Sequence, residues 1–147
     1  MKRFVFKLGA LLELRKQHEE NIKLLLAEKN REIIAATGDL NRYYEELKEL
    51  QSSEKTRRAG QEPVQLLRYS VAYRYKLKSD ILRTGRWVQD LQAEASGIQK
   101  KLLDATKARR ALEIIRDRQF DVWKKEYRRK EQNFIDDVAQ QKYIASH

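Results

Sequence analysis

The side chains best suited to chemistry are scattered along the chain and form no recognisable catalytic or metal-binding motif. The two histidines, His18 and His147, stand far apart in sequence, and no HExxH motif or Cys/His cluster is present. The chain has no cysteine and no glycine-rich phosphate loop. Its carboxylates alternate with Lys and Arg, as they do on solvated helix surfaces. The sequence therefore predicts no catalytic residue, no metal site and no cofactor, and indicates a protein that is not an enzyme.

Two basic stretches with interleaved aromatic residues are the next candidates for a binding function. Residues 54–86 hold nine Lys or Arg against three acidic residues, and residues 107–130 hold ten against four. The net charge of +10 suits nucleic acid, an acidic protein surface or anionic lipid. The basic residues are mixed with acids around the helix and form neither one stripe nor a basic region before a zipper. We therefore favour an acidic protein surface as the partner, and a nucleic-acid-binding coiled coil is the alternative.

The first fifteen residues, MKRFVFKLGALLELR, could belong to a signal peptide or to an amphipathic helix. A signal peptide needs an unbroken apolar core of about 7–15 residues and a small-residue cleavage site. Lys7 interrupts the apolar run, and Leu8, Leu11 and Leu12 have the spacing of one helix turn. No run reaches the roughly 18–20 apolar residues of a membrane span. We expect a cytoplasmic protein without direct membrane insertion.

The elements that carry these residues must be few and long. Charged residues make up 37% of the chain, which has only five glycines and one proline. Glu, Lys, Arg, Leu, Ala and Gln dominate, as in coiled coils, and no alternating β-branched run indicates a strand. The composition predicts an all-α fold.

A seven-residue apolar repeat begins near the N-terminus and lasts about six heptads. Ten of its thirteen positions are apolar, and the charged Arg15, Glu19 and Lys29 predict looser packing, or a different packing partner, toward its start. The positions of this first seam are Leu8, Leu12, Arg15, Glu19, Ile22, Leu26, Lys29, Ile33, Ala36, Leu40, Tyr43, Leu47 and Leu50.

A second seam follows the only proline, Pro63, which suits the first turn of a helix but not its interior. This seam runs through Leu77, Ile81, Thr84, Val88, Leu91, Ala95, Ile98, Leu102, Ala105, Arg109 and Leu112. Two amphipathic helices joined by a short connection fold back on each other. We therefore predict one coiled-coil domain over residues 1–147, a long antiparallel two-helix hairpin. The first helix spans about 5–57, the turn about 58–63, and the longer second helix about 64–142.

The unequal helix lengths leave part of the second helix without a partner. With the turn near Gly60, Leu8 lies opposite residues 112–114, and residues 116–143 have no intramolecular contact. This overhang still carries large apolar residues, among them Phe120, Trp123 and Tyr127. We interpret it, together with the start of the first helix, as a docking tip, with self-association through the same residues as the alternative.

Glycines within the helices indicate flexible points or close backbone packing at Gly38, Gly85 and Gly97.

Two stretches of the sequence resemble the FliJ family, the small stalk proteins of the flagellar type III export apparatus. The opening FVFKLGALLELRKQHEE is similar to the family's N-terminal pattern of Phe, Leu, a Leu pair, Leu-Arg and a later Glu. The closing EQNFIDDVAQQK is similar to the family's C-terminal stretch, in which a hydrophobic residue precedes an acidic pair and then Ala. The resemblance, together with size, basic character and the two-helix pattern, covers nearly the whole length. The related stalk of virulence-type secretion systems is not separated from it by these features.

The resemblance implies a role and a set of partners. FliJ-like proteins are similar to the coiled-coil part of the rotary ATPase γ subunit, and they insert the end that carries both termini into the hexameric export ATPase. They promote its assembly and activity, contact the membrane-embedded export gate and help to handle export chaperones. The implied location is cytoplasmic, peripheral to the inner membrane at the flagellar base.

The family's functional residues carry over to two regions of this chain. On the first helix and near the C-terminus, the resemblance implies that the ATPase ring contacts Phe4, Phe6, Leu8, Leu11, Leu12, Arg15, Ile135, Asp136, Asp137, Val138 and Ala139. Phe120, Trp123 and Tyr127 of the overhang join this ring-binding set. Gate contact is implied near the start of the second helix, where Tyr73 and Leu77 match an aromatic residue followed four residues later by Leu, with Asp80 and Thr84 next along the helix.

Overall fold

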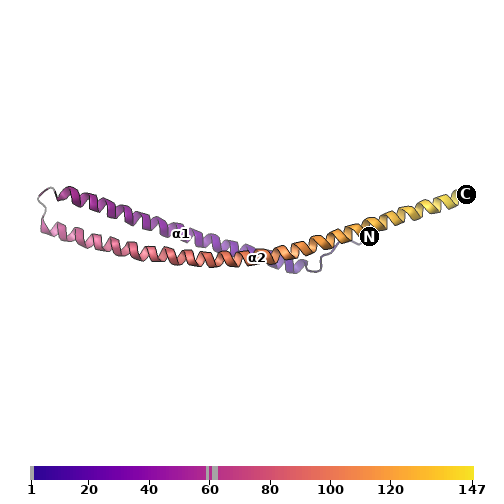
Figure 1. Ribbon diagram of the computed structural model, residues 1–147, viewed down its shortest axis with the longest axis horizontal. Coiled ribbons are helices and arrows are strands. Elements are labelled where there is room, and N and C mark those ends of the chain that lie inside the picture. Colours follow the sequence, from indigo (N-terminus) through magenta and orange to yellow (C-terminus); the bar gives the residue numbers. More distant parts are fainter. Residues whose placement is uncertain (1, 59, 61–62) are drawn as a thin grey trace. The chain divides into compact units, whose positions relative to one another are not determined.

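The computed structural model describes residues 2–58, 60 and 63–147, and these form two helices and no strand. Helix α1 spans Gly9–Arg57, 49 residues, and α2 spans Val64–Ser146, 83 residues (Figure 1). They pack against each other as an antiparallel hairpin with the second helix longer than the first, which confirms the predicted fold class. Neither helix is long and apolar enough, within this described part, to cross a membrane.

The structure divides into two compact units, and each helix contributes to both. The terminal unit combines Met1–Asn21 with Leu102–His147, and the central unit is Ile22–Lys101. Each unit contains one segment of α1 and one segment of α2. The assignment of residues 1–147 to a single coiled-coil domain stays a prediction.

The observed helix bounds differ from the predicted ones mainly at the N-terminus. We expected the first helix from about residue 5, but residues 2–6 are not helical, and α1 begins at Gly9. The Phe-Val-Phe run has low helix propensity, no Ser, Thr, Asp or Asn stands there to cap a helix, and basic residues oppose the positive end of the helix dipole. Helix α2 begins at Val64 as predicted, and the carbonyl of Pro63 accepts the first backbone hydrogen bonds. It continues to Ser146, beyond the predicted end near 142. Part of the predicted turn, residues 59, 61 and 62, lies outside the described residues.

The core follows the two predicted seams. In the central unit Ala36, Val88 and Leu91 form a buried cluster, and Ile33 and Leu40 pack against it. The remaining buried apolar residues also lie on the seams: Leu12, Ile22, Leu77, Ala95 and Ala105. Two of the thirteen first-seam positions, Leu8 and Arg15, are exposed. A seven-residue period is thus sufficient to identify which face of each helix is buried.

The looser packing that we predicted toward the start of the first seam agrees with the exposure of Leu8 and Arg15, whereas Glu19 and Lys29 are paired across the helices. In the terminal unit Glu19, only 4% exposed, accepts a hydrogen bond from Nε of Arg109, whose Nη1 lies 2.8 Å from Glu113. In the central unit Nζ of Lys29 lies 2.8 Å from Glu94, and buried Glu54 lies 3.5 Å from Arg74. In each of these three pairs an acid on one helix meets a base on the other, and charge pairing replaces apolar packing at these levels.

Candidate functional site

An aromatic cluster in the terminal unit is the most distinctive surface feature of the chain. It consists of Phe4, Phe120, Trp123 and Tyr127. Phe4 meets Phe120 edge-on at a ring-centroid distance of 5.2 Å and contacts Trp123 at 5.9 Å. Phe120 stacks on Trp123 at 5.8 Å, and Trp123 contacts Tyr127 at 5.3 Å. The three α2 residues share one face because they are three and four positions apart.

The cluster shows that the overhang is partly covered, so the prediction of no intramolecular contact after residue 116 is wrong for Phe120 and Trp123. Phe4 reaches them because the N-terminal segment is not helical. A non-helical chain can advance by up to about 3.3 Å per residue, whereas a helix advances by about 1.5 Å. The N-terminal segment therefore follows α2 farther than a helical segment of the same length would.

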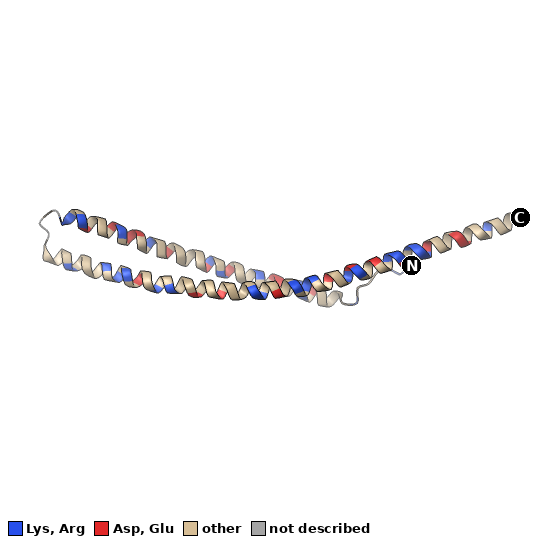
Figure 2. Cartoon of the chain, viewed as in Figure 1, with Lys and Arg blue, Asp and Glu red and all other residues tan. Residues whose placement is uncertain are grey.

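Beyond the cluster, the end of α2 keeps several large apolar side chains in solvent. Phe134 is 69% exposed, Ile135 58%, Tyr143 67% and Ile144 74%. The mostly basic run KKEYRRK at 124–130, which includes Tyr127 of the cluster, precedes them, and Figure 2 shows it as closely spaced blue bands on α2. Exposed apolar patches rimmed by charge are typical of protein interaction sites. The end of α2 thus offers exposed apolar side chains next to a basic run at 124–130 and to the acidic pair Asp136 and Asp137.

The structure brings the predicted ring-binding residues into one unit but gives them different roles. Leu12 is 3% exposed and belongs to the core. Phe4, Phe6, Trp123, Tyr127 and Val138 are half-buried, and the rest are exposed: Leu8, Leu11, Arg15, Phe120, Ile135, Asp136, Asp137 and Ala139. Asp136 accepts a 3.0 Å hydrogen bond from Gln132 one turn earlier. The exposed members can contact a partner directly, whereas Leu12 can only support the fold.

The predicted gate-binding residues lie along α2 in the central unit, and their exposure also differs. Leu77 is only 2% exposed, so its side chain is part of the hairpin core. Tyr73 is 41% exposed, and its hydroxyl donates a 3.1 Å hydrogen bond to Glu46 of α1. This hydrogen bond raises the pKa of Tyr73 above its ordinary value. Asp80 pairs with Arg83 at 2.9 Å, and Thr84 is half-buried. Tyr73, Asp80 and Thr84 are the members of this set that a partner can reach.

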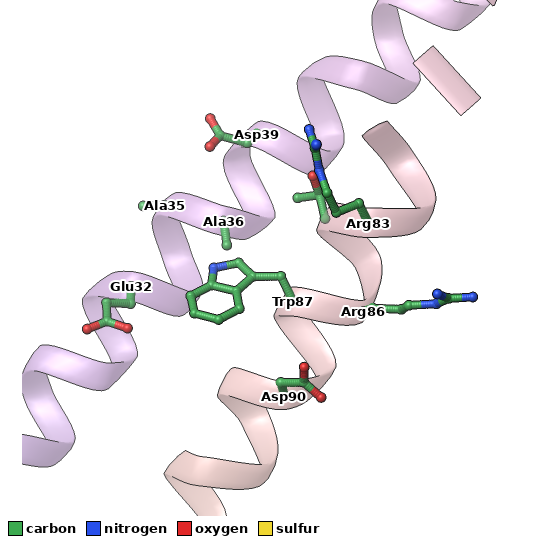
Figure 3. A pocket seen from close by; sticks show the side chains of 9 residues that line it. Glu32, Ala35, Ala36, Asp39, Arg83, Arg86, Trp87 and Asp90 are labelled. Atoms are coloured by element: carbon green, nitrogen blue, oxygen red, sulfur yellow. The ribbon is translucent and has the colours of Figure 1, made fainter. Parts of the chain in front are cut away.

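A groove of about 760 Å³ lies beside Thr84, between α1 and α2 of the central unit. Figure 3 shows the indole of Trp87 pointing across it toward Ala35 and Ala36 of α1. Trp87 is 52% exposed, although the residues around it include small alanines that leave room for a larger contact. The heptad pattern does not identify Trp87, because this residue lies next to the second seam and not on it. A bulky aromatic residue facing alanines across a predicted seam was the signal available.

Ion pairs shift the pKa values of two seam bases. The hydrogen bond to Glu94, and more weakly that to Glu32, raises the pKa of Lys29. The hydrogen bonds to Glu19 and Glu113 raise the pKa of Arg109. Both bases therefore stay charged throughout the physiological range.

Among the residues whose positions the structure describes, no three His, Asp or Glu side chains gather as a metal site would require.

Fold and surface define a class of protein: a basic, two-helix antiparallel coiled coil whose termini share an apolar and aromatic end. A comparison with family models identifies the class more closely, since the model described as Flagellar FliJ protein matches residues 4–147. The chain belongs to the FliJ family and is a component of flagellar type III protein export. No curated protein and no solved structure matches the chain.

Proposed function

We propose that the chain is a non-enzymatic stalk of the flagellar export apparatus, which inserts its terminal unit into the hexameric export ATPase and promotes assembly and activity of the ring. The observation that supports this proposal is the apolar end of α2. Phe134, Ile135 and Ile144 are each more than half exposed on a helix otherwise rich in charged residues. Burying them in a partner removes a large apolar area from water, which is favourable by about 25 cal/mol per Å².

The second part of the proposal is that the chain contacts the export gate and helps to handle export chaperones. Tyr73, Asp80 and Thr84 form the accessible gate-binding surface, and the adjoining groove with Trp87 enlarges it. Leu77 supports this surface from the core. The protein acts in the cytoplasm, at the membrane-proximal base of the flagellum. Membership of the flagellar family favours this role over the equivalent stalk of a virulence-type system.

The test is ATP hydrolysis by the cognate export ATPase, measured with and without the full-length chain at low and moderate salt. Ile135→Asp places a charge on the exposed end of α2, and Ile34→Asp makes the same change at a site 71% exposed in the central unit. We expect wild type and Ile34→Asp to stimulate hydrolysis, and Ile135→Asp to lose most of the stimulation. Leu12 also belongs to the implied ring-binding set, but Leu12→Asp would not test ring binding specifically, because Leu12 is buried and the substitution would disrupt the core.

Stimulation that is equal for all three proteins would refute insertion through this end. Circular dichroism provides the control for folding, because both substitutions lie on exposed helix surface and should leave the helical signal unchanged. Deleting the residues after Phe120 should have the same effect on hydrolysis as Ile135→Asp.

A further inference from the structure

A second apolar stripe runs along α2 on a face separate from the seam. Its residues are Val64, Leu67, Val71, Tyr75 and Leu82, which we call the docking face. They are spaced three, four and seven residues apart, as are residues that share one side of a helix. Their exposed fractions are 65%, 39%, 39%, 71% and 60%. By contrast, Ser70 and the seam residue Leu77 of the same stretch are buried. This part of α2 is therefore apolar on two sides, and α1 covers only one of them.

The docking face contains two hollows of the kind that accept side chains from a facing helix in a coiled coil. One hollow is lined by Val64, Leu67, Arg68, Val71 and Ala72, and the next by Val71, Arg74, Tyr75 and Lys78. Both hollows contain residues at i, i+3, i+4 and i+7, and the second lies one heptad after the first. In coiled coils, four residues at this spacing form the hole that accepts one apolar side chain from the facing helix. Two such holes in succession fit two side chains that are seven residues apart on another helix.

The charge of this segment restricts what can bind. Residues 63–79 contain four basic residues and no acidic one, although the chain as a whole has 22 acidic residues. Arg74 is engaged with Glu54 of α1, while Arg68 and Lys78 are exposed beside the two hollows. A second copy in a symmetric contact would bring these basic residues against their own counterparts. A helix with acidic residues next to its apolar stripe avoids that repulsion.

We propose that the docking face binds an amphipathic helix of a partner protein, with apolar residues at heptad spacing and Asp or Glu on the flanking positions. The apolar residues fill the two hollows, and the acidic residues pair with Arg68 and Lys78. The surface differs from the one proposed for the gate. Val71 and Tyr73 are two positions apart in sequence and so about 200° apart around the helix. The proposal also stands apart from ring insertion, since every residue of the docking face belongs to the central unit.

The test uses a labelled synthetic peptide of about four heptads with Leu at positions a and d and Glu at e and g, titrated with the full-length chain and followed by fluorescence anisotropy. The control peptide carries Lys in place of each Glu. We expect binding of the Glu peptide only. Val71→Asp should weaken it by about tenfold or more, and the matched change Ile34→Asp should leave it within about twofold.

A second variant tests whether charge pairing selects the partner. Because it is expected to gain binding of the Lys peptide, misfolding cannot explain its result. Arg68→Glu combined with Lys78→Glu should lose the Glu peptide and gain the Lys peptide. Equal binding of both peptides to wild type, or binding of the Glu peptide that Val71→Asp does not change, would overturn the proposal. So would Val71-dependent binding of vesicles containing phosphatidylserine, or of a single-stranded oligonucleotide, without binding of the Glu peptide.

The same variants separate this surface from ring activation. Val71→Asp should still stimulate the export ATPase, and Ile135→Asp should still bind the Glu peptide. Loss of both activities in Val71→Asp, with the helical signal intact, would contradict a separate docking face.

Discussion

The contact between the N-terminal segment and the aromatic cluster is open to a direct test with Phe4→Ala. This substitution removes two ring contacts, to Phe120 at 5.2 Å and to Trp123 at 5.9 Å. Aromatic pairs are worth about 0.5–1.5 kcal/mol each beyond the area that they bury. The two contacts together give about 1–3 kcal/mol. The equilibrium between attached and detached segment should therefore shift toward detachment by roughly 5- to 150-fold.

The assay is the fluorescence of Trp123, which reports the contact because the ring of Phe4 packs against the indole in a tilted arrangement. The chain has two tryptophans, so Trp87→Phe provides the background in which Trp123 is the only tryptophan. We expect Phe4→Ala to shift the emission of Trp123 to longer wavelength and to speed amide hydrogen exchange in residues 2–8. Val5→Ala is the matched control, since Val5 is 75% exposed. If the two variants gave the same emission and the same exchange, Phe4 would not hold the segment on α2.

Three further predictions concern stability and titration. Gly97→Ala should raise the free energy of unfolding by about 1 kcal/mol in urea titrations, because Ala is the better helix former and the added methyl meets no atom within 4 Å. Tyr73 should ionise above its ordinary pKa of 10.0 in an alkaline absorbance titration, and Tyr73→Phe should remove that step. The stabilisation from its hydrogen bond to Glu46 is therefore full below pH 10.0 and is lost as the pH rises through the raised pKa. Arg109→Glu should lower the melting temperature, and Glu19→Arg combined with Arg109→Glu should restore part of it, since the pair with Glu19 is remade but Glu113 then faces a like charge. A double variant as unstable as the single one would contradict their pairing.

Much of the fold could be predicted from the sequence because a heptad pattern reports directly which helix face is buried. Leu91 and Leu77, the two most completely buried large side chains, are both seam positions. Pro63 located the start of α2 because its ring excludes it from a helix interior. These are local rules, and they need no knowledge of which residues face each other.

The parts that could not be predicted depend on the register of one helix against the other. The sequence marked Glu19, Lys29 and Arg109 as seam positions, but periodicity alone does not say which charge meets which. We also predicted that the first helix begins near residue 5, and a helical N-terminal segment would not bring Phe4 to Phe120, so this contact was not predicted. The glycines within the helices show the same limit. A methyl group added at any of them would meet nothing within 4 Å, so close backbone packing is not the reason for Gly38, Gly85 and Gly97.

The charged seam positions account for a property that the apolar ones cannot supply, which is a single register. Apolar heptads remain matched when one helix slides by seven residues, so they tolerate such a slip. In the terminal unit, a slip by one heptad would place Glu19 opposite Leu102 or Arg116 in place of Arg109. In the central unit, Lys29 would meet Trp87 or Lys101 in place of Glu94. A slip in one direction leaves both charges against apolar residues, and in the other direction it sets Lys29 against Lys101. Buried charges without partners are strongly destabilising. The ion pairs that weaken the apolar pattern therefore select the register in which the aromatic cluster forms.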